Sequence, residues 1–195
     1  MSCATPNPAE PRSLAELAQA LDHVSDAPKE SGTLVLIVRR PVVDAREVLA
    51  EGDLNCVEGL VGDSWSRRGS SRSVDGLAHP DMQLNLMNAR AIEAIAGPMT
   101  RWPLAGDQLF VDFDLGQSNV PAGTRLAIGE AVVEVTDQPH TGCGKFAARF
   151  GVDALKWVNS PDGRALSLRG INARVVVAGR IRHGDIVGKL PPGPV

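Results

Sequence analysis

The spacing of hydrophobic and polar residues predicts short strands along most of the chain. Residues 33–39 contain the uninterrupted apolar run LVLIV, which is typical of a buried strand. Shorter apolar or alternating runs bounded by turn residues predict further strands at 108–115, 124–129, 131–137 and 172–181. The Gly-Glu pair between the second and third of these runs suits a tight hairpin.

Helical periodicity is confined to a few segments. We expect helices at 13–23, 44–50 and 151–159, and residues 82–97 begin like a strand before becoming helical near Asn88. The first two helices begin at a serine and an aspartate, which can cap them. Because the second half of the chain is mostly strands joined by turns, we expect a mostly β fold with a few helices (α+β), built on a strand-rich barrel.

The composition fits an ordinary globular chain. Its 195 residues are 43% hydrophobic and 22% charged, with a formal net charge of -3. We expect a disordered lead over 1–12, which holds three prolines, followed by a single domain over 13–195. The acidic balance gives no reason to expect nucleic acid as a partner. No stretch approaches the roughly 20 apolar residues of a membrane span, and the start lacks the pattern of a secretory signal. We therefore expect no membrane partner and a cytoplasmic location.

A polar, glycine- and serine-rich segment, GDSWSRRGSSRSVDG at 62–76, predicts a long surface loop. It carries the arginines Arg67, Arg68 and Arg72. One interpretation is a mobile connector. The other is a flap that brings positive charge over a functional site, because loops of this length are often functional.

The strongest candidate for chemistry is Cys143, within QPHTGCGKFAARFG at 138–151. Glycine on both sides of the cysteine would let a bulky ligand approach the sulfur. His140, Lys145 and Arg149 are cationic or potentially cationic neighbours, and such neighbours favour the thiolate that acts as nucleophile or metal ligand. These residues predict covalent chemistry or coordination of a metal that accepts soft ligands.

A structural interpretation of the same stretch stays open. Cys143 could fill space in a turn, and the two basic residues after it could form the solvent face of a helix whose inner face is Phe146 and Phe150. Cys56 is expected to be a buried or bystander thiol, and Cys3 lies in the expected lead. Three scattered cysteines form neither a disulfide framework nor a zinc motif.

Other polar residues are weaker candidates. His79 could line a pocket, although a histidine before proline commonly has a structural role, and His183 is expected in an exposed turn. Asn85 and Asn119 could present amides to a polar ligand. The sequence contains neither a dinucleotide-binding nor a P-loop motif, which disfavours both kinds of nucleotide site.

The order of several segments resembles the MOSC domain, the module at the C-terminus of molybdenum cofactor sulfurases. The matching segments are EGLVGDSW, MQLNLMN, LAGDQLFVDFDL, SNVPAGTRLAIGEAVVEVTDQPHTGCGKFAARFG and LRGINARVVVAGRIRHGDIVGKL, which together cover most of 31–190. The family carries a single cysteine after a strand in an Arg-x-Pro-Cys-like turn, and Cys143 in His-Thr-Gly-Cys falls at that position. Asn119 falls where the family has an asparagine before a Gly-x-x-Leu-x-Ile-Gly run.

The resemblance implies a barrel like the β-barrel domain of pyruvate kinase and a role tied to molybdenum or sulfur. It implies that Cys143 carries sulfur or ligates the metal of a molybdenum-pterin cofactor, with His140 and Lys145 tuning the thiolate. The implied contacts to an anionic pterin phosphate are Arg149, Asn119, Asn85, Arg67 and Arg68. Pyridoxal phosphate is associated with the family, and a cysteine desulfurase or a molybdoenzyme is the implied partner. His140 replaces the family's arginine, and could supply a hydrogen bond or, when protonated, a charge.

Two other functions remain open on the residues alone. The chain could be a metal-free thiol enzyme that acts on small electrophiles through Cys143. Alternatively, it could be a non-catalytic binding domain in which the cysteine only fills space.

Overall fold

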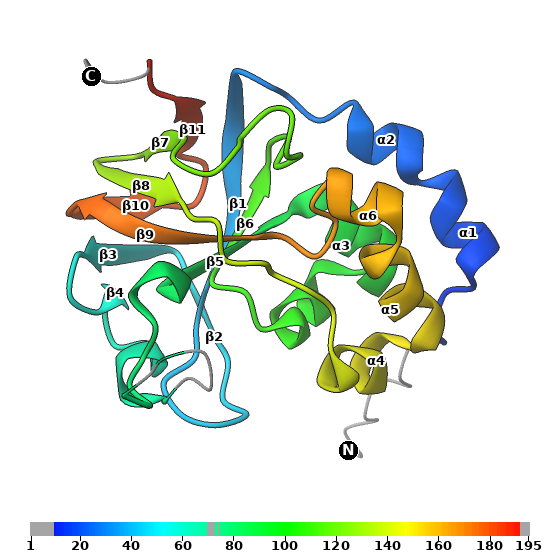
Figure 1. The fold of residues 1–195 in the computed structure, drawn as a ribbon, viewed down its shortest axis with the longest axis horizontal. Coiled ribbons are helices and arrows are strands. Elements are labelled where there is room, and N and C mark those ends of the chain that lie inside the picture. Colours follow the sequence, from blue (N-terminus) through cyan, green and yellow to red (C-terminus); the bar gives the residue numbers. More distant parts are fainter. Residues whose placement is uncertain (1–9, 70–72, 74, 192–195) are drawn as a thin grey trace, which may run out of the picture.

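Seven strands close into a mixed β-barrel in the part of the chain that the computed structural model describes, residues 10–69, 73 and 75–191 (Figure 1). Around the barrel the order is β1 (Ser31–Arg39), β6 (Leu109–Asp112), β5 (Leu84–Asn88), β9 (Ile171–Val177), β8 (Ala131–Val135), β7 (Arg125–Ile128) and β11 (Ile186–Lys189). Strand β11 pairs with both β7 and β1, which closes the barrel. Strands β5 and β6 run parallel, and the other barrel pairs are antiparallel. The expected α+β fold with a strand-rich barrel is therefore confirmed.

A small second sheet adjoins the barrel. It consists of β10 (Gly179–Arg182), β3 (Glu51–Asn55) and β4 (Gly59–Leu60), and Figure 1 shows it on the side of the barrel away from the helices.

The expected helix at 44–50 is wrong, because this segment contributes strand β2 (Glu47–Leu49). Strand β2 pairs with the second half of β1, and Leu49 packs against the barrel core. Arg39 of β1 holds the neighbouring Glu47 in an ion pair of 2.6 Å. Asp44 has a left-handed backbone (φ 62°), so it turns the chain and does not cap a helix.

Helices gather on the opposite side of the barrel (Figure 1). They are α1 (Leu14–Gln19), α2 (Leu21–Ser25), α3 (Ala89–Ala96), α4 (Gly144–Phe150), α5 (Val152–Asn159) and α6 (Pro161–Ala165), with 3-10 turns η1 (Trp65–Arg67), η2 (Pro80–Met82) and η3 (Met99–Ala105). Two hydrophobic cores result. One fills the barrel and includes Leu34, Leu86 and Val111, while the other joins the barrel wall to the helices.

Several local predictions are confirmed. Ser13 begins α1 with a reciprocal capping box, and Asn88 caps α3 by accepting from two backbone amides. The hairpin between β7 and β8 turns at Gly129 and Glu130, as expected. Most of the expected lead, residues 1–9, and part of the polar loop, residues 70–72 and 74, lie outside the described residues. Within the described ranges, no helix has the length and apolarity to span a bilayer.

Candidate functional site

Cys143 lies at the N-terminal end of α4, and its side chain is exposed. The two flanking glycines have different surroundings. The backbone of Gly142 is tied to the Asn159 side chain by hydrogen bonds of 3.0 and 3.1 Å, whereas a Cβ added at Gly144 would meet nothing within 4 Å. There is therefore open space beside Gly144, the residue that follows the cysteine. The exposed thiol and the buried Phe146 of α4 fit the helical interpretation of this stretch as well.

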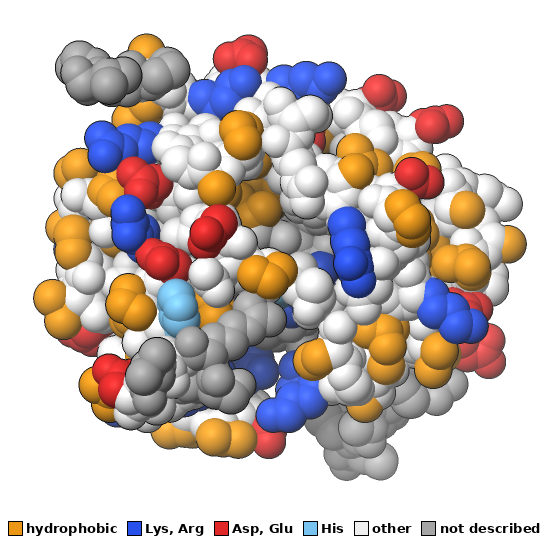
Figure 2. Space-filling view, viewed as in Figure 1, with side chains coloured by type: hydrophobic (Ala, Val, Ile, Leu, Met, Phe, Trp, Pro, Cys, Tyr) orange, Lys and Arg blue, Asp and Glu red, His pale blue; other side chains and the backbone are white. Residues whose placement is uncertain are grey.

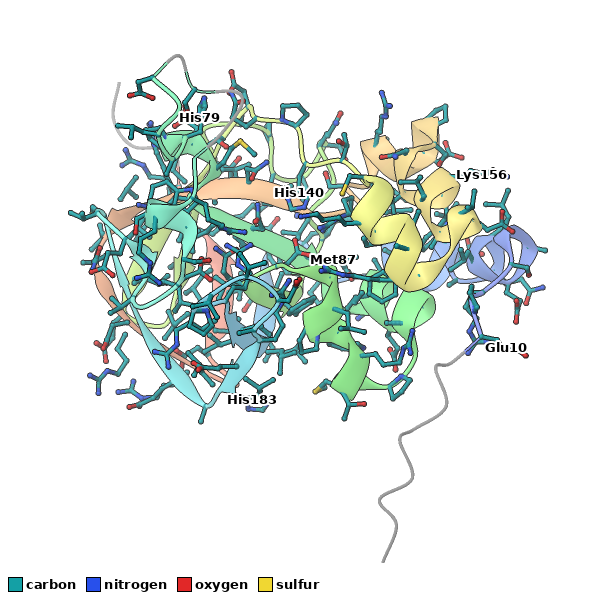
Figure 3. All side chains as sticks on the ribbon, turned by 90° about the horizontal axis from the view of Figure 1, so that it is seen from below. Glu10, His79, Met87, His140, Lys156 and His183 are labelled. Atoms are coloured by element: carbon teal, nitrogen blue, oxygen red, sulfur yellow. The ribbon has the colours of Figure 1, made fainter. Side chains whose placement is uncertain are left out.

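His140, three residues earlier, lies between α4 and the barrel strands (Figure 3). Its Nδ1 is 3.1 Å from the side-chain nitrogen of Asn85 on β5. Its Nε2 is 3.5 Å from a carboxylate oxygen of Asp107, which precedes β6 and is fully buried. Strand β5 and the segment before β6 thus position the imidazole from both of its nitrogens.

The surrounding hydrogen bonds determine which nitrogen carries the proton. Arg40 donates to the Asn85 side-chain oxygen at 3.3 Å, so the Asn85 amide nitrogen points toward His140. That nitrogen also donates to Asn172 at 2.7 Å, and the Asn172 amide in turn donates to the backbone of Gln138. Because Asn85 presents a donor, Nδ1 of a neutral His140 is an acceptor and its proton lies on Nε2, facing Asp107.

Two buried ion pairs enclose this cluster. Arg169 donates to both oxygens of Asp107 at 2.9 and 2.7 Å, and its guanidinium also lies 4.9 Å from the ring centroid of Phe146. Burial raises the pKa of Asp107, and the charge of Arg169 opposes that rise.

The second pair joins Asp63 to Arg40. Asp63 accepts hydrogen bonds of about 3.0 Å from the Arg40 guanidinium and one from the Arg40 backbone at 2.9 Å. Burial acts to raise the pKa of Asp63, but these hydrogen bonds and the Arg40 charge outweigh it, so the net shift is downward.

Further arginines gather next to this pair. The pKa of Arg46 is lowered by burial and then by the charges of Arg149 and Arg40. The pKa of Arg68 is lowered by burial and by the charges of Arg40 and Arg46. Only partial neutralisation comes from Asp63 and from the exposed Asp44, so positive charge is in excess here. Figure 2 shows Lys and Arg side chains around a hollow on the lower part of the molecule, near α4.

The structure brings some of the predicted residues together. Asn85 contacts His140, and Arg68 and Arg149 belong to one arginine cluster through Arg46. Lys145 is exposed on α4.

The remaining predicted residues have contacts elsewhere. Arg67 donates to the carbonyl of Pro41. The side-chain amide of Asn119 donates to the carbonyls of Lys29 and Asp114, and its oxygen accepts from Lys189. His79 caps η2, His183 lies in an exposed turn, and Cys56 is an exposed thiol rather than a buried one.

Sequence reasoning missed six polar residues of this site: Arg40, Arg46, Asp63, Asp107, Arg169 and Asn172. The available signal was position, because Arg40 directly follows β1 and Asp107 lies two residues before β6. A charged residue at the end of a buried strand is a candidate for a buried pair.

A sequence profile for the MOSC domain matches residues 73–188. The chain belongs to the MOSC domain family. No curated protein sequence matches it. Solved structures of similar fold include the YuaD protein from Bacillus subtilis, with a TM-score of 0.57 and 16% identity over 80% of this chain and 94% of that one.

Two YiiM structures are also similar to this MOSC domain. YiiM from Escherichia coli has a TM-score of 0.53 and 18% identity, covering 84% of this chain and 72% of that chain. YiiM from Geobacillus stearothermophilus has a TM-score of 0.52 and 16% identity, covering 82% and 75%. At these identities the likeness concerns the fold alone. The family is associated with the C-terminal domains of molybdenum cofactor sulfurases.

Proposed function

We propose that this MOSC-domain protein binds a molybdenum-pterin cofactor, or carries sulfur for one, through Cys143. The observation that carries the proposal is an exposed thiol at the start of α4 while the same helix contributes Arg149 to a cluster of excess arginine charge. Helix α4 therefore links a soft ligand to a group of cations.

The residues fit such a cofactor. Among the described residues, no group of three or more His, Cys, Asp and Glu side chains could hold a bare metal ion. A metal already held by a pterin needs only one further soft ligand, which a thiolate supplies. The phosphate of the pterin needs cations, and Arg46, Arg68 and Arg149 would hold it, because guanidinium groups bind phosphate through paired hydrogen bonds.

The barrel also holds a hydrogen-bonding side chain next to the loop of Cys143. Asn85 and Asp107 hold His140 beside the loop that leads to Cys143, where it supplies a directed hydrogen-bonding group in place of the family's arginine. When bound, the molybdenum centre would supply two-electron redox or sulfur-exchange chemistry. A sulfur-carrying role would make a cysteine desulfurase or a molybdoenzyme the partner.

The test is metal and pterin analysis of protein purified from a host that makes the cofactor. Wild type is expected to contain molybdenum and pterin, and Cys143→Ala is expected to lose most of the molybdenum. Cys56→Ala is the matched control, because both thiols are exposed and unpaired by disulfide. Equal molybdenum in wild type and Cys143→Ala, or none in either, would overturn the ligand role.

The arginine cluster has its own test in the same preparation. Arg68→Gln is expected to lower the pterin content, since it removes a half-exposed cation whose only ion pair with a described residue is a distant one to Asp63 at 4.0 Å. Arg125→Gln, an exposed arginine on β7 paired with Glu134, is the control and is expected to retain it. Unchanged pterin in Arg68→Gln would remove this residue from the phosphate site.

A further inference from the structure

A cleft of about 520 Å³ has His140 in its lining, and its lining includes none of Arg40, Arg46, Arg68 and Arg149. It is lined by the loop at 117–122, by 135–141 at the end of β8, and by 163–172 between α6 and β9. Helix α6 and strands β8 and β9, which adjoin these segments, can be followed in Figure 1. A backbone hydrogen bond of 2.9 Å from Gln117 to the carbonyl of Ala165 joins the first and last of these segments. The volume is in the range of small-molecule sites.

The floor of the cleft is apolar and rigid. It includes Val120, Val135, Val158 and Ile171, which are each at most 9% exposed and belong to the two hydrophobic cores. Binding of an apolar ligand body on this floor would be favourable, because it removes apolar surface of both the ligand and the floor from water.

The rim, in contrast, carries several polar side chains that have no partner among the residues that the structure describes. Arg164 is exposed at the end of α6, and its guanidinium makes no hydrogen bond or ion pair with any residue that the structure describes. The side chains of Gln117, Thr141 and Ser167 are likewise without a hydrogen bond in the described ranges. Arg169 also lines the cleft, but Asp107 already neutralises it.

This pattern selects a ligand with acceptor oxygens and a single negative charge. A guanidinium with hydroxyl and amide donors around it suits a carboxylate. The one exposed carboxylate of the lining, Asp137, lies on the β8 side and accepts a hydrogen bond from Gln138. Its charge repels a ligand with several negative charges.

We infer that this cleft binds a small organic monocarboxylate with an apolar body, with Arg164 holding the carboxylate. The proposal does not depend on the metal or sulfur role of Cys143, because Cys143 does not line the cleft. It places the ligand against His140 and Thr141, and Thr141 is two residues before Cys143 in the sequence.

The experiment compares two probes of equal shape, 4-methylpentanoate and the neutral 4-methylpentanamide, by backbone amide NMR shifts of the full chain at low salt. The carboxylate is expected to bind in the millimolar range and to shift amides of 117–122 and 163–172. Arg164→Gln is expected to weaken the carboxylate about fivefold and to leave the amide unchanged, which is the scale of an exposed ion pair. Asp137→Asn is expected to tighten carboxylate binding, because it removes a like charge.

Two further variants control the result. Arg182→Gln, an exposed arginine on β10 outside the cleft, is expected to bind both probes as wild type does. Ala122→Trp is expected to block both probes, because Ala122 is an exposed residue of the lining and a large ring there fills the cleft. The proposal is overturned if neither probe shifts the cleft amides, if both probes bind equally, or if Arg164→Gln binds the carboxylate as well as wild type. None of these outcomes bears on the molybdenum content, so the two proposals fail separately.

Discussion

At the scale of single residues, His140 is the side chain whose chemistry depends most on its surroundings. A histidine can be a donor, an acceptor or a cation depending on its neighbours. Here Asn85 presents a donor to Nδ1 and Asp107 presents a carboxylate to Nε2. Arg40 donates to the Asn85 side-chain oxygen and so fixes the direction of the Asn85 amide. The tautomer of His140 therefore depends on Arg40 through Asn85.

Asn85→Ala is therefore expected to change the tautomer of His140. In the wild type, the nitrogen shifts of neutral His140 should show an unprotonated Nδ1 and a protonated Nε2, as read from long-range proton–nitrogen NMR spectra. The variant removes the donor to Nδ1 and should give a mixture of both tautomers. His183, in an exposed turn, provides the reference within the same spectrum. A wild-type His140 protonated on Nδ1 would contradict the hydrogen-bond assignment.

At the scale of elements, the loop before α4 is held by its contacts with α5. Gly142 is hydrogen-bonded to Asn159, and a Cβ at Gly142 would lie 2.8 Å from Leu155 and 2.9 Å from Val158. The glycine is thus required by close packing of the loop on a helix. This packing fixes where α4 begins and therefore where Cys143 lies.

The two glycines beside Cys143 are expected to respond oppositely to alanine. Gly142→Ala should lower the free energy of unfolding by about 1–3 kcal/mol, because the added methyl overpacks against α5. Gly144→Ala should be neutral or raise it by up to about 1 kcal/mol, because Gly144 begins α4 with open space around it and alanine favours the helix. Urea denaturation of both variants and wild type measures the difference. Equal stability of the two variants would show that the loop shifts freely away from α5.

Local elements could largely be predicted from the sequence, because their signals are local. Ser13 and Asn88 have side chains suited to capping, and each begins a helix. The segment at 44–50 could not be assigned correctly, because its strand depends on pairing with β1 and not on its own periodicity. Cys143 and His140 became candidates through residue type and spacing, and the family resemblance added to the case for Cys143. The partners Asp107, Arg169 and Asn172 did not, because the fold brings them from separate segments to one end of the barrel.

At the scale of the whole molecule, buried charge connects the site to stability. Asp63 follows β4 and Arg40 follows β1, so their ion pair ties the small sheet to the barrel. Asp107 and Arg169 form a corresponding pair between the strands and the helical core, since Arg169 also contacts Phe146. Removing one member of a buried pair leaves the other without a counter-charge, which is strongly unfavourable.

Asp63→Asn is expected to lower the free energy of unfolding by about 3–5 kcal/mol at neutral pH, since Arg40 then lacks its counter-charge. The variant should also change the pH dependence. The pKa of Asp63 is lower in the folded state than the value of about 3.9 in an unfolded chain. Its ionised form therefore contributes stability above about pH 4, and that contribution is lost as the pH falls through the folded-state pKa.

Urea denaturation between about pH 7 and pH 3 measures this contribution as the difference between wild type and Asp63→Asn at each pH. The raised pKa of Asp107 changes the stability with pH in the direction opposite to Asp63. This effect is the same in wild type and in Asp63→Asn, so it cancels from the difference between them. The difference should shrink as the pH falls below about 4. Asp53→Asn, which removes an exposed carboxylate paired with Arg180, is the control and should cost at most about 1 kcal/mol. A constant difference across the whole range would show that Asp63 stabilises the fold through its shape and hydrogen bonds alone, with no contribution from its charge.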